Sequence, residues 1–516
     1  MKFTRGSGVL MHPTSFSGPH GIGDMGVESR RFVDWLVTAG QTLWQVLPLG
    51  PTGYGDSPYA SFSTFAGQPL MISLDELVHL GDLHPNDLHN LPTFPLGKVD
   101  FGWVQYWKKP ILNKAAENFL AKASPERKAQ FEKFVKEESH WLEDFALFMA
   151  VKDHFQAIAD KDNLMGKMWS NYWDSDIALK EPKAVKAWSE KLSAQILSIK
   201  VIQWYFYTQW LALKKYANDK GIQIIGDIPI FVAADSVDVW ANKELFHLDK
   251  AGQPLLVAGV PPDYFSATGQ LWGNPLYKWD AHKKQKFQWW IDRVQGVLKL
   301  VDILRIDHFR GFEAYWEIPA GKPTAIDGRW VKAPGMELFE AIKKALGRLP
   351  IIAEDLGVIT PEVEEMRDHF EFPGMKILQF AFDSSEAGAS GDNPFLPHNY
   401  VQNCIVYTGT HDNDTALGWY RSVPEGDQKL ARDYVHAHEE DVVWGFVRAC
   451  IASTARWSVV PMQDLLNVGA DGRMNTPSTL SDKNWSWRIL SGQVPEDLAS
   501  RLHHITKLYG RAPVRK

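Results

Sequence analysis

Cysteine is scarce in this chain of 516 residues, which contains only Cys404 and Cys450. Two cysteines allow at most one disulfide, and both lie in apolar stretches of the kind that fill a reduced core. We therefore expect a reducing compartment and a cytoplasmic protein. The first residues lack the apolar run of a signal peptide, and no stretch is long and apolar enough to span a membrane. We expect neither a leader nor a membrane partner.

Excess positive charge is also lacking, because 62 acidic residues outnumber 55 basic ones and give a net charge of −7. Phosphate binding requires a basic face, so we do not expect nucleic acid as a partner. Aromatic residues are abundant by contrast, with 22 Trp, 27 Phe and 15 Tyr. Such rings fill large cores, and their faces also stack on sugar rings.

Short apolar segments that predict strands alternate with segments that predict helices. The eight predicted strands are residues 8–11, 42–49, 222–229, 301–307, 349–355, 375–381, 404–414 and 458–464. Helices are predicted between them, for example at residues 29–39 and 336–346. This alternation predicts an α/β fold, a (β/α)8 TIM barrel. The alternative is an open doubly wound sheet, which the missing Gly-x-Gly-x-x-Gly after the first strand disfavours.

Two stretches interrupt the alternation, so we expect one catalytic barrel over residues 1–516 with two insertions. Residues 70–220 predict amphipathic helices, one beginning at Ser124-Pro125 and one or two over residues 184–220, packed on the barrel as a helical subdomain. Residues 230–290 predict a loop-rich insertion near the active site. Within it, residues 260–275 are dense in Gly, Pro and aromatics without any period, which indicates a lid or a guide for substrate.

Four acidic residues, Asp227, Asp307, Glu354 and Asp412, lie at the ends of four predicted strands. The carboxyl ends of barrel strands meet on one face, so these carboxylates are expected to converge on one pocket. Arg305 is two residues from Asp307 and shares its face of the strand. A carboxylate beside a guanidinium stays ionised at neutral pH, as a nucleophile requires.

Clustered carboxylates serve two chemistries, and the residues favour one of them. A divalent metal could bind among them, but Arg305 already supplies positive charge beside Asp307, so we expect no metal and no cofactor. The other chemistry is retaining glycoside cleavage, which needs two carboxyl groups about 5–5.5 Å apart. Neighbouring strands about 4.8 Å apart can place Asp307 and Glu354 at that separation. Asp412, from across the barrel, could hold sugar hydroxyls.

The motifs at the predicted strand ends resemble those of the amylomaltases. These are the 4-α-glucanotransferases (disproportionating enzymes) of glycoside hydrolase family 77 in the α-amylase superfamily. The resemblance covers nearly the whole chain. It rests on residues 8–26 (GVLMHPTSFSGPHGIGDMG), 44–59 (WQVLPLGPTGYGDSPY), 226–231 (GDIPIF), 261–275, 304–311 (LRIDHFRG), 353–357 (AEDLG), 409–415 (GTHDNDT) and 461–464. Thr410 stands before His411 where amylases usually have Asn, which favours the transferase branch.

The resemblance implies transfer of an α-1,4-glucan segment from a donor maltodextrin to the 4-hydroxyl of glucose or another maltodextrin, through a covalent glycosyl-enzyme. It implies that Asp307 is the nucleophile, Glu354 the general acid/base and Asp412 the transition-state stabiliser, with Arg305 supporting Asp307. The implied sugar contacts are Tyr54, Ser57, Tyr59, Asp227, Trp272, His308, His411 and Asn475. The alternatives are an α-1,4-glucan hydrolase of the same superfamily and a non-catalytic glucan-binding barrel.

Overall fold

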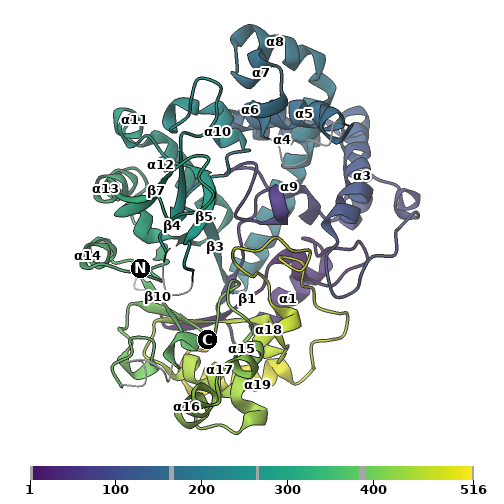
Figure 1. Ribbon diagram of the computed structural model, residues 1–516. Coiled ribbons are helices and arrows are strands. Elements are labelled where there is room, and N and C mark those ends of the chain that lie inside the picture. Colours follow the sequence, from purple (N-terminus) through teal and green to yellow (C-terminus); the bar gives the residue numbers. More distant parts are fainter. Residues whose placement is uncertain (1–3, 162–167, 263–265, 383–390, 514–516) are drawn as a thin grey trace.

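A parallel sheet of eight strands forms the centre of the molecule (Figure 1). The structure is a computed structural model that describes residues 4–161, 168–262, 266–382 and 391–513. The strand order is β10-β11-β12-β1-β2-β3-β6-β9. At the seam, the amide of Ala353 donates to the carbonyl of Pro373 over 3.0 Å, so the sheet nearly closes on itself. The strands are β1 (Gly6–Leu10), β2 (Leu43–Gln45), β3 (Gln223–Pro229), β6 (Ile303–Asp307), β9 (Ile351–Ala353), β10 (Gly374–Ile377), β11 (Cys404–Tyr407) and β12 (Trp457–Pro461).

The predicted (β/α)8 barrel is confirmed, and each of the eight strands lies within or overlaps its predicted segment. The strands are buried along nearly their whole length, since helices cover the outer face of a barrel and side chains fill its interior. Val9, Ile224 and Ile405, for example, have no exposed surface. This two-sided burial is why the strands appear in the sequence as continuous apolar runs.

Helices follow the strands and surround the barrel. They are α1 (Val27–Thr38), α12 (Gln288–Leu300), α13 (Gly335–Leu346), α14 (Pro361–His369), α15 (Ala416–Ser422), α16 (Glu425–Val435), α17 (Val442–Ala452), α18 (Met462–Leu465) and α19 (Leu498–Leu508). The helices predicted at residues 29–39 and 336–346 correspond to α1 and α13. In Figure 1, α15 to α19 lie at the bottom of the view and α11 (Trp279–Lys284) to α14 on its left.

The stretch between β2 and β3 contains most of the remaining helices: α2 (Leu74–His79), α3 (Phe101–Lys122), α4 (Pro125–Glu137), α5 (Ser139–Lys161), α6 (Trp169–Tyr172), α7 (Ser175–Ala178), α8 (Pro182–Lys191) and α9 (Ser193–Asp219). The helix predicted from Ser124-Pro125 is two helices, because the backbone at Glu138 leaves helical geometry. Most of these helices gather at the top of Figure 1, away from α15 to α19. The division into a barrel and a helical subdomain stays a prediction.

Helix α9 joins the helical stretch to the barrel. It packs on α3, α4 and α5, and also on α1, α12 and β3. Trp210 in α9 is fully buried, and its indole Nε1 donates to the carbonyl of Leu300 at the end of α12 over 2.8 Å. The ring also contacts Trp44 of β2. Trp210 therefore fastens the long helix directly to two elements of the barrel.

A second, antiparallel sheet is formed by two strands within residues 230–290, predicted to be rich in loops, and two strands between β6 and β9. Its order is β5-β4-β7-β8, formed by β4 (Leu256–Val260), β5 (Gln270–Pro275), β7 (Ala314–Pro319) and β8 (Arg329–Lys332). Residues 270–275 are therefore a strand and not a loop. Gly273 and Pro275 conceal this in the sequence, because both are uncommon inside strands and are tolerated at an edge. Residues 263–265 of the predicted lid lie outside the described residues.

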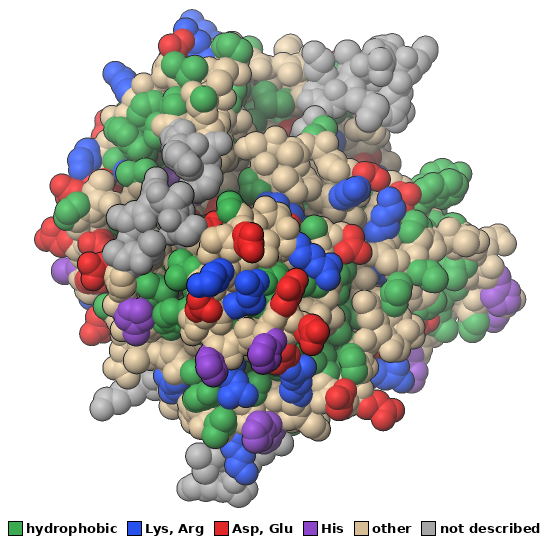
Figure 2. All heavy atoms as spheres, turned by 60° about the horizontal axis from the view of Figure 1, so that its bottom comes forward, with side chains coloured by type: hydrophobic (Ala, Val, Ile, Leu, Met, Phe, Trp, Pro, Cys, Tyr) green, Lys and Arg blue, Asp and Glu red, His purple; other side chains and the backbone are tan. Residues whose placement is uncertain are grey.

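The surface agrees with the charge composition. On the face shown in Figure 2, Lys and Arg side chains are interspersed with Asp and Glu. Among the helices of the described residues, none combines the length and the apolar character that crossing a bilayer requires.

We expect Trp210→Ala to destabilise the fold by about 3–5 kcal/mol, because it opens a cavity and leaves the Leu300 carbonyl without its indole donor. Denaturant unfolding followed by circular dichroism measures the change. Lys215→Ala on the exposed side of the same helix is the control, with an effect of about 0.5 kcal/mol or less. Equal stability of the two variants would contradict the role of Trp210 as the link between α9 and the barrel.

Candidate active site

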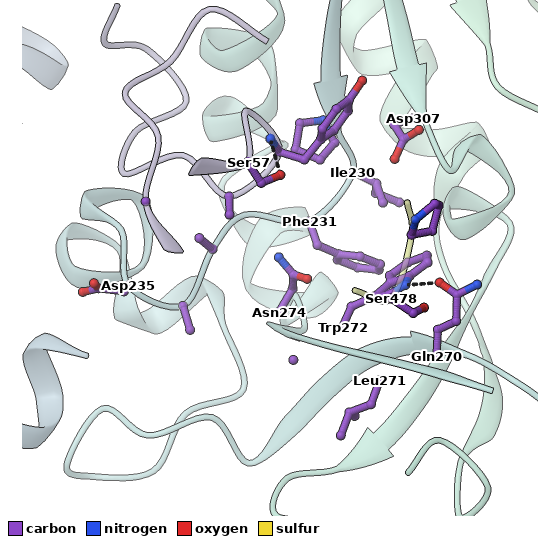
Figure 3. Close-up of a pocket in the computed structure, with 18 of the residues that line it drawn as sticks. Ser57, Ile230, Phe231, Asp235, Gln270, Leu271, Trp272, Asn274, Asp307 and Ser478 are labelled. Atoms are coloured by element: carbon purple, nitrogen blue, oxygen red, sulfur yellow. Dashed lines mark hydrogen bonds between the residues drawn. The ribbon is translucent and has the colours of Figure 1, made fainter. Parts of the chain in front are cut away.

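A cleft of about 810 Å³ opens at the carboxyl ends of the barrel strands. Figure 3 shows Asp307 pointing into this pocket from the barrel, with Trp272 near its centre and Asp235 at the far side. Eight of the residues predicted from the sequence line it: Ser57, Tyr59, Trp272, Asp307, His308, His411, Asp412 and Asn475. Loops that are far apart in the sequence therefore meet around one cavity, as the barrel topology requires.

Arg305 lies behind this cavity and holds two carboxylates at once. Its Nη1 donates to Oδ2 of Asp227 over 2.6 Å, and its Nη2 donates to Oδ1 of Asp307 over 2.9 Å. The side chains of Arg305 and Asp227 are buried, whereas that of Asp307 is 30% exposed. Asp227 and Arg305 are register partners on the neighbouring strands β3 and β6. The strand pairing itself thus places the guanidinium between the two acids.

Burial and neighbouring charges shift the pKa values of Arg305 and Asp227. Burial disfavours the charge on Arg305, but Asp227 and Asp307 outweigh it and raise the pKa of Arg305. Burial raises the pKa of Asp227 to about 7 despite the nearby Arg305. The hydroxyl of Tyr59 donates to the same Oδ2 of Asp227 over 2.9 Å. Asp227 therefore acts on the cavity through Arg305 and Tyr59, because it does not line the cavity itself.

Glu354 follows β9 directly, next to the end of β6. The register pairs Ile306 with Ala353, so Asp307 and Glu354 come one residue beyond paired positions on adjacent strands. The Glu354 side chain accepts from the amide of His308 over 2.6 Å and from the amide of Leu356 over 2.9 Å. Burial, and next the charge of Asp307, raise the pKa of Glu354 to about 8. Both causes favour the protonated form of this carboxyl group.

The turn after Asp307 makes this contact possible. His308 has a φ of 52°, a left-handed conformation that is uncommon for residues other than glycine. With the chain bent in this way, the His308 amide reaches the Glu354 carboxyl group of the next strand. Local strain of this kind is maintained where the surroundings fix it, and it is typical of functional sites.

Asp412 approaches from the loop after β11 and is held by a neighbouring loop. Asn475 Nδ2 donates to its Oδ1 over 2.7 Å, and the Asn475 amide donates to the carbonyl of His411 over 3.0 Å. Arg473 completes the contact, since its guanidinium donates to the backbone carbonyls of Asp412 and Asn475, each over 2.7 Å. The Asp412 side chain is 43% exposed, so it remains open to the cavity.

Aromatic and imidazole rings form the walls around these acids. The Tyr59 ring stacks on His411 with centroids 5.0 Å apart, and Trp485 packs against both. Across the site, Trp272 meets His308 edge to face at 4.8 Å. Burial lowers the pKa of His411 and lowers that of His308 to about 4, so both imidazoles are neutral at pH 7. Neutral imidazoles can donate and accept hydrogen bonds with sugar hydroxyls.

The structure thus gathers all of the predicted residues that it describes. Asp307, Asp412 and the six predicted lining residues face the cavity, Arg305 and Asp227 are buried behind it, and Glu354 is buried beside Asp307 at the end of the neighbouring strand. Tyr54 lies in the 3-10 turn Tyr54–Asp56 of the neighbouring loop, and its side chain is outside the described part. Among the described residues, no cluster of three His, Cys, Asp or Glu side chains is arranged to hold a metal ion.

Several site residues were not predicted from the sequence. Arg473 and Trp485 come from the loop after β12, and Phe62, Lys152, Tyr172 and Asp235 form a further part of the cleft wall. None of them carries a periodic or motif signal. The sequence signal that could have located Trp485 and Arg473 is their position in a loop after the eighth strand, because such loops form the active site of a barrel.

Comparison with known proteins agrees with this geometry. The family profile described as 4-α-glucanotransferase matches residues 11–492. The 4-α-glucanotransferase of Thermus thermophilus is 49% identical over 97% of this chain and 98% of that protein, and the one of Synechocystis is 47% identical over 98% of each. Among solved structures, an amylomaltase from Streptococcus agalactiae in complex with acarbose superposes with a TM-score of 0.93, at 44% identity over 99% of this chain and 100% of that one.

Fold, site and relatives together place this protein among the carbohydrate-active enzymes built on a (β/α)8 barrel. Within that class, the chain belongs to the 4-α-glucanotransferase family, glycoside hydrolase family 77. The resemblance drawn from the motifs is therefore confirmed, and so is the prediction that the protein is a transferase.

The contacts of Glu354 predict how its pKa responds to its neighbours. Asp307→Asn removes a negative charge beside Glu354, so we expect the pKa of Glu354 to fall from about 8 while burial keeps it above 4.5. Infrared difference spectra of the carboxyl stretch over a pH series measure it. Asp412→Asn, on a different loop, is the control and should shift the pKa much less. An unchanged pKa in Asp307→Asn would contradict the coupling of the two groups.

Proposed function

We propose that this enzyme transfers α-1,4-glucan segments by a retaining double displacement in which Asp307 is the nucleophile and Glu354 the general acid/base. One observation carries the proposal: on adjacent strands, Asp307 is paired with the Arg305 guanidinium over 2.9 Å, and burial together with the charge of Asp307 raises the pKa of the neighbouring Glu354 to about 8. Retaining cleavage requires two acids that differ in their affinity for a proton, since one group must attack and the other must protonate the leaving oxygen.

In the first step, the glucan lies across the barrel mouth with its scissile bond between the two acids. Glu354 donates its proton to the departing glycosidic oxygen while an oxygen of Asp307 bonds to the anomeric carbon. A β-linked glycosyl-enzyme forms and the shortened chain leaves with the proton. As Asp307 loses its charge to the new bond, Glu354 becomes the remaining carboxylate of the pair.

In the second step, Glu354 accepts the proton of the 4-hydroxyl of glucose or of another maltodextrin, and that oxygen attacks the anomeric carbon. The bond to Asp307 breaks, and the product is again α-1,4-linked. One glycosidic bond replaces another of the same kind, so the energetics require neither a nucleotide nor a cofactor. We propose maltooligosaccharides and longer α-1,4-glucans as donors and glucose as a competent acceptor.

The remaining site residues support the charge that develops at the anomeric centre. Asp412 is open to the cavity and anchored by Asn475, so it can hold sugar hydroxyls firmly as the ring distorts. Ser57, Tyr59, Trp272, His308, His411 and Asn475 line the same cavity and are proposed sugar contacts. Tyr54 on the neighbouring loop is a further proposed contact, whereas the buried side chain of Asp227 does not reach the cavity, so the direct sugar contact expected of it is not retained. Asp227 would act by orienting Tyr59 and Arg305. The stretch over residues 260–275 is the proposed shield against water.

A cytoplasmic location also belongs to the proposal. Cys404 and Cys450 are both buried free thiols, and burial raises the pKa of the Cys404 thiol to about 12. Such thiols are compatible with a reducing compartment.

We expect Asp307→Asn to lower kcat for glucan transfer by about 10⁴-fold, because no covalent intermediate can form. The measurement is the rate of glucose release from maltotriose. Asp302→Asn, just before β6 and away from the cleft, is the control and should retain activity. Normal turnover by Asp307→Asn would exclude its role as nucleophile.

Incubation with maltotriose distinguishes the proposed activity from its alternatives. A transferase yields glucose together with a ladder of longer chains and little net gain in reducing ends. An α-1,4-glucan hydrolase yields only shorter sugars and a steady gain in reducing ends, and a non-catalytic glucan-binding barrel leaves maltotriose unchanged. Chromatography of the products with a reducing-end assay measures both quantities, and either of the last two patterns would contradict the proposal.

The pH profile follows from the pKa of Glu354. The acid is active while protonated, and its pKa in the folded enzyme is raised to about 8. We therefore expect kcat/KM to be maintained at neutral pH and to fall about tenfold per pH unit above about 8. Steady-state transfer rates between pH 6 and 10, with unfolding checked at each pH, test this. Activity undiminished at pH 10 would contradict the role of Glu354 as the acid.

A further inference from the structure

The cleft continues past the carboxylates toward the helical stretch between β2 and β3. At that end its wall is formed by Phe62, Lys152, Tyr172 and Asp235. Figure 3 shows Asp235 and Asp307 at opposite sides of the pocket. The mechanism above uses none of these four residues, since a sugar at the anomeric centre is held by groups at the other end.

An ion pair between α5 and the loop after β3 organises this part of the wall. Lys152 Nζ lies 2.5 Å from Oδ2 of Asp235 and 4.9 Å from the centre of the Phe62 ring. The indole Nε1 of Trp169 in α6 donates to the carbonyl of Ala234 over 3.2 Å. The ammonium, carboxylate and ring are therefore fixed relative to one another by contacts from several elements.

The position of this ion pair is better explained by ligand binding than by a contribution to folding stability. Burying the Lys152 charge and ordering its side chain both cost free energy, and the attraction to Asp235 offsets this cost without adding much net stability. The side chains of Lys152 and Asp235 are 11% and 26% exposed, so polar atoms stay open to the cleft. Fixed charged groups hydrogen-bond adjacent sugar hydroxyls strongly, and the nearby Tyr172 offers an aromatic ring for contact with a sugar face.

We propose that Lys152, Asp235 and Tyr172 form a subsite that binds a glucosyl unit of a linear α-1,4-glucan remote from the scissile bond. This inference rests on the proposed function, because the same cleft must hold the chain. Chains too short to extend from Asp307 to Asp235 cannot occupy the subsite. The subsite therefore gives the enzyme a preference for longer glucans, expressed in KM because the contact is equal in the ground and transition states.

The test compares two isosteric substitutions in ion pairs of the same helix. Asp235→Asn weakens the pair in the cleft wall, and Asp153→Asn weakens the Lys109–Asp153 pair, which is 2.7 Å long and faces away from the cleft. The two aspartates are similarly exposed, at 26% and 29%. Initial transfer rates are measured with maltotriose, maltopentaose, maltoheptaose and soluble amylose, and thermal unfolding is recorded for each variant.

For Asp235→Asn we expect kcat/KM to fall about tenfold with the longest glucans, mainly through KM, and to stay within about twofold for maltotriose. Asp153→Asn should match the wild type with every substrate. Tyr172→Ala should repeat the chain-length-dependent loss through the aromatic contact alone. An equal loss with all substrates would indicate a structural role, and no loss with any would indicate no contact; either result overturns the subsite.

The outcome is separable from that of the proposed function. If the wild type does not form longer chains from maltotriose, then the proposed transfer reaction is contradicted. If it does, and the ratio of rates for amylose and maltotriose is the same in Asp235→Asn as in the wild type, then only the remote subsite is wrong.

Discussion

The site depends on one guanidinium group shared by two acids. Arg305 hydrogen-bonds Asp227 on one side and Asp307 on the other, with a forked, planar geometry that a lysine cannot reproduce. Both contacts follow from strand register, because Asp227 and Arg305 are paired across β3 and β6, and Arg305 and Asp307 share one face of β6. The position of the proposed nucleophile is thus determined by the barrel and not by a loop.

The buried guanidinium of Arg305, which lies between two acids, also affects a third acid, Glu354. Arg305 stabilises the charge of Asp307, and the charge of Asp307 in turn disfavours ionisation of Glu354 on the next strand. Burial acts in the same direction, whereas the amides of His308 and Leu356 oppose it. In the proposed mechanism, two carboxyl groups of similar intrinsic acidity therefore take opposite roles because of their surroundings. In that mechanism, Glu354 gives up its proton as the charge of Asp307 is consumed in the new bond.

Much of this could be predicted from the sequence, for identifiable reasons. A strand buried on both faces appears as an apolar run, and a polar residue at its end is conspicuous, so Asp227, Asp307 and Glu354 could be located. Asp412 and His411 stand in such a position after β11. The edge strand β5 could not be predicted, because its pairing partners lie elsewhere in the chain and its glycine and proline indicate a loop. Burial and register, which set the pKa of Glu354, are likewise properties of the folded barrel.

The residues that escaped prediction share one property: their roles arise only from tertiary contact. Arg473 acts on Asp412 through backbone carbonyls, a role that any arginine in a polar loop could have. Lys152 belongs to a helix whose Asp144 and Asp153 also form ion pairs, and only the approach of Asp235 from the barrel places the Lys152 pair in the cleft wall.

The site therefore contains two kinds of residue: those positioned by strand register and those positioned only by tertiary contact. In the proposed mechanism, the barrel supplies the groups that react, and hydrogen-bonded strand pairing holds them at the strand ends. The helical stretch and the outer loops supply the residues of the proposed subsite remote from the reacting bond. A barrel of this type can then alter which glucans it accepts by changing its inserted wall, while the register that fixes Asp307, Arg305 and Glu354 stays untouched.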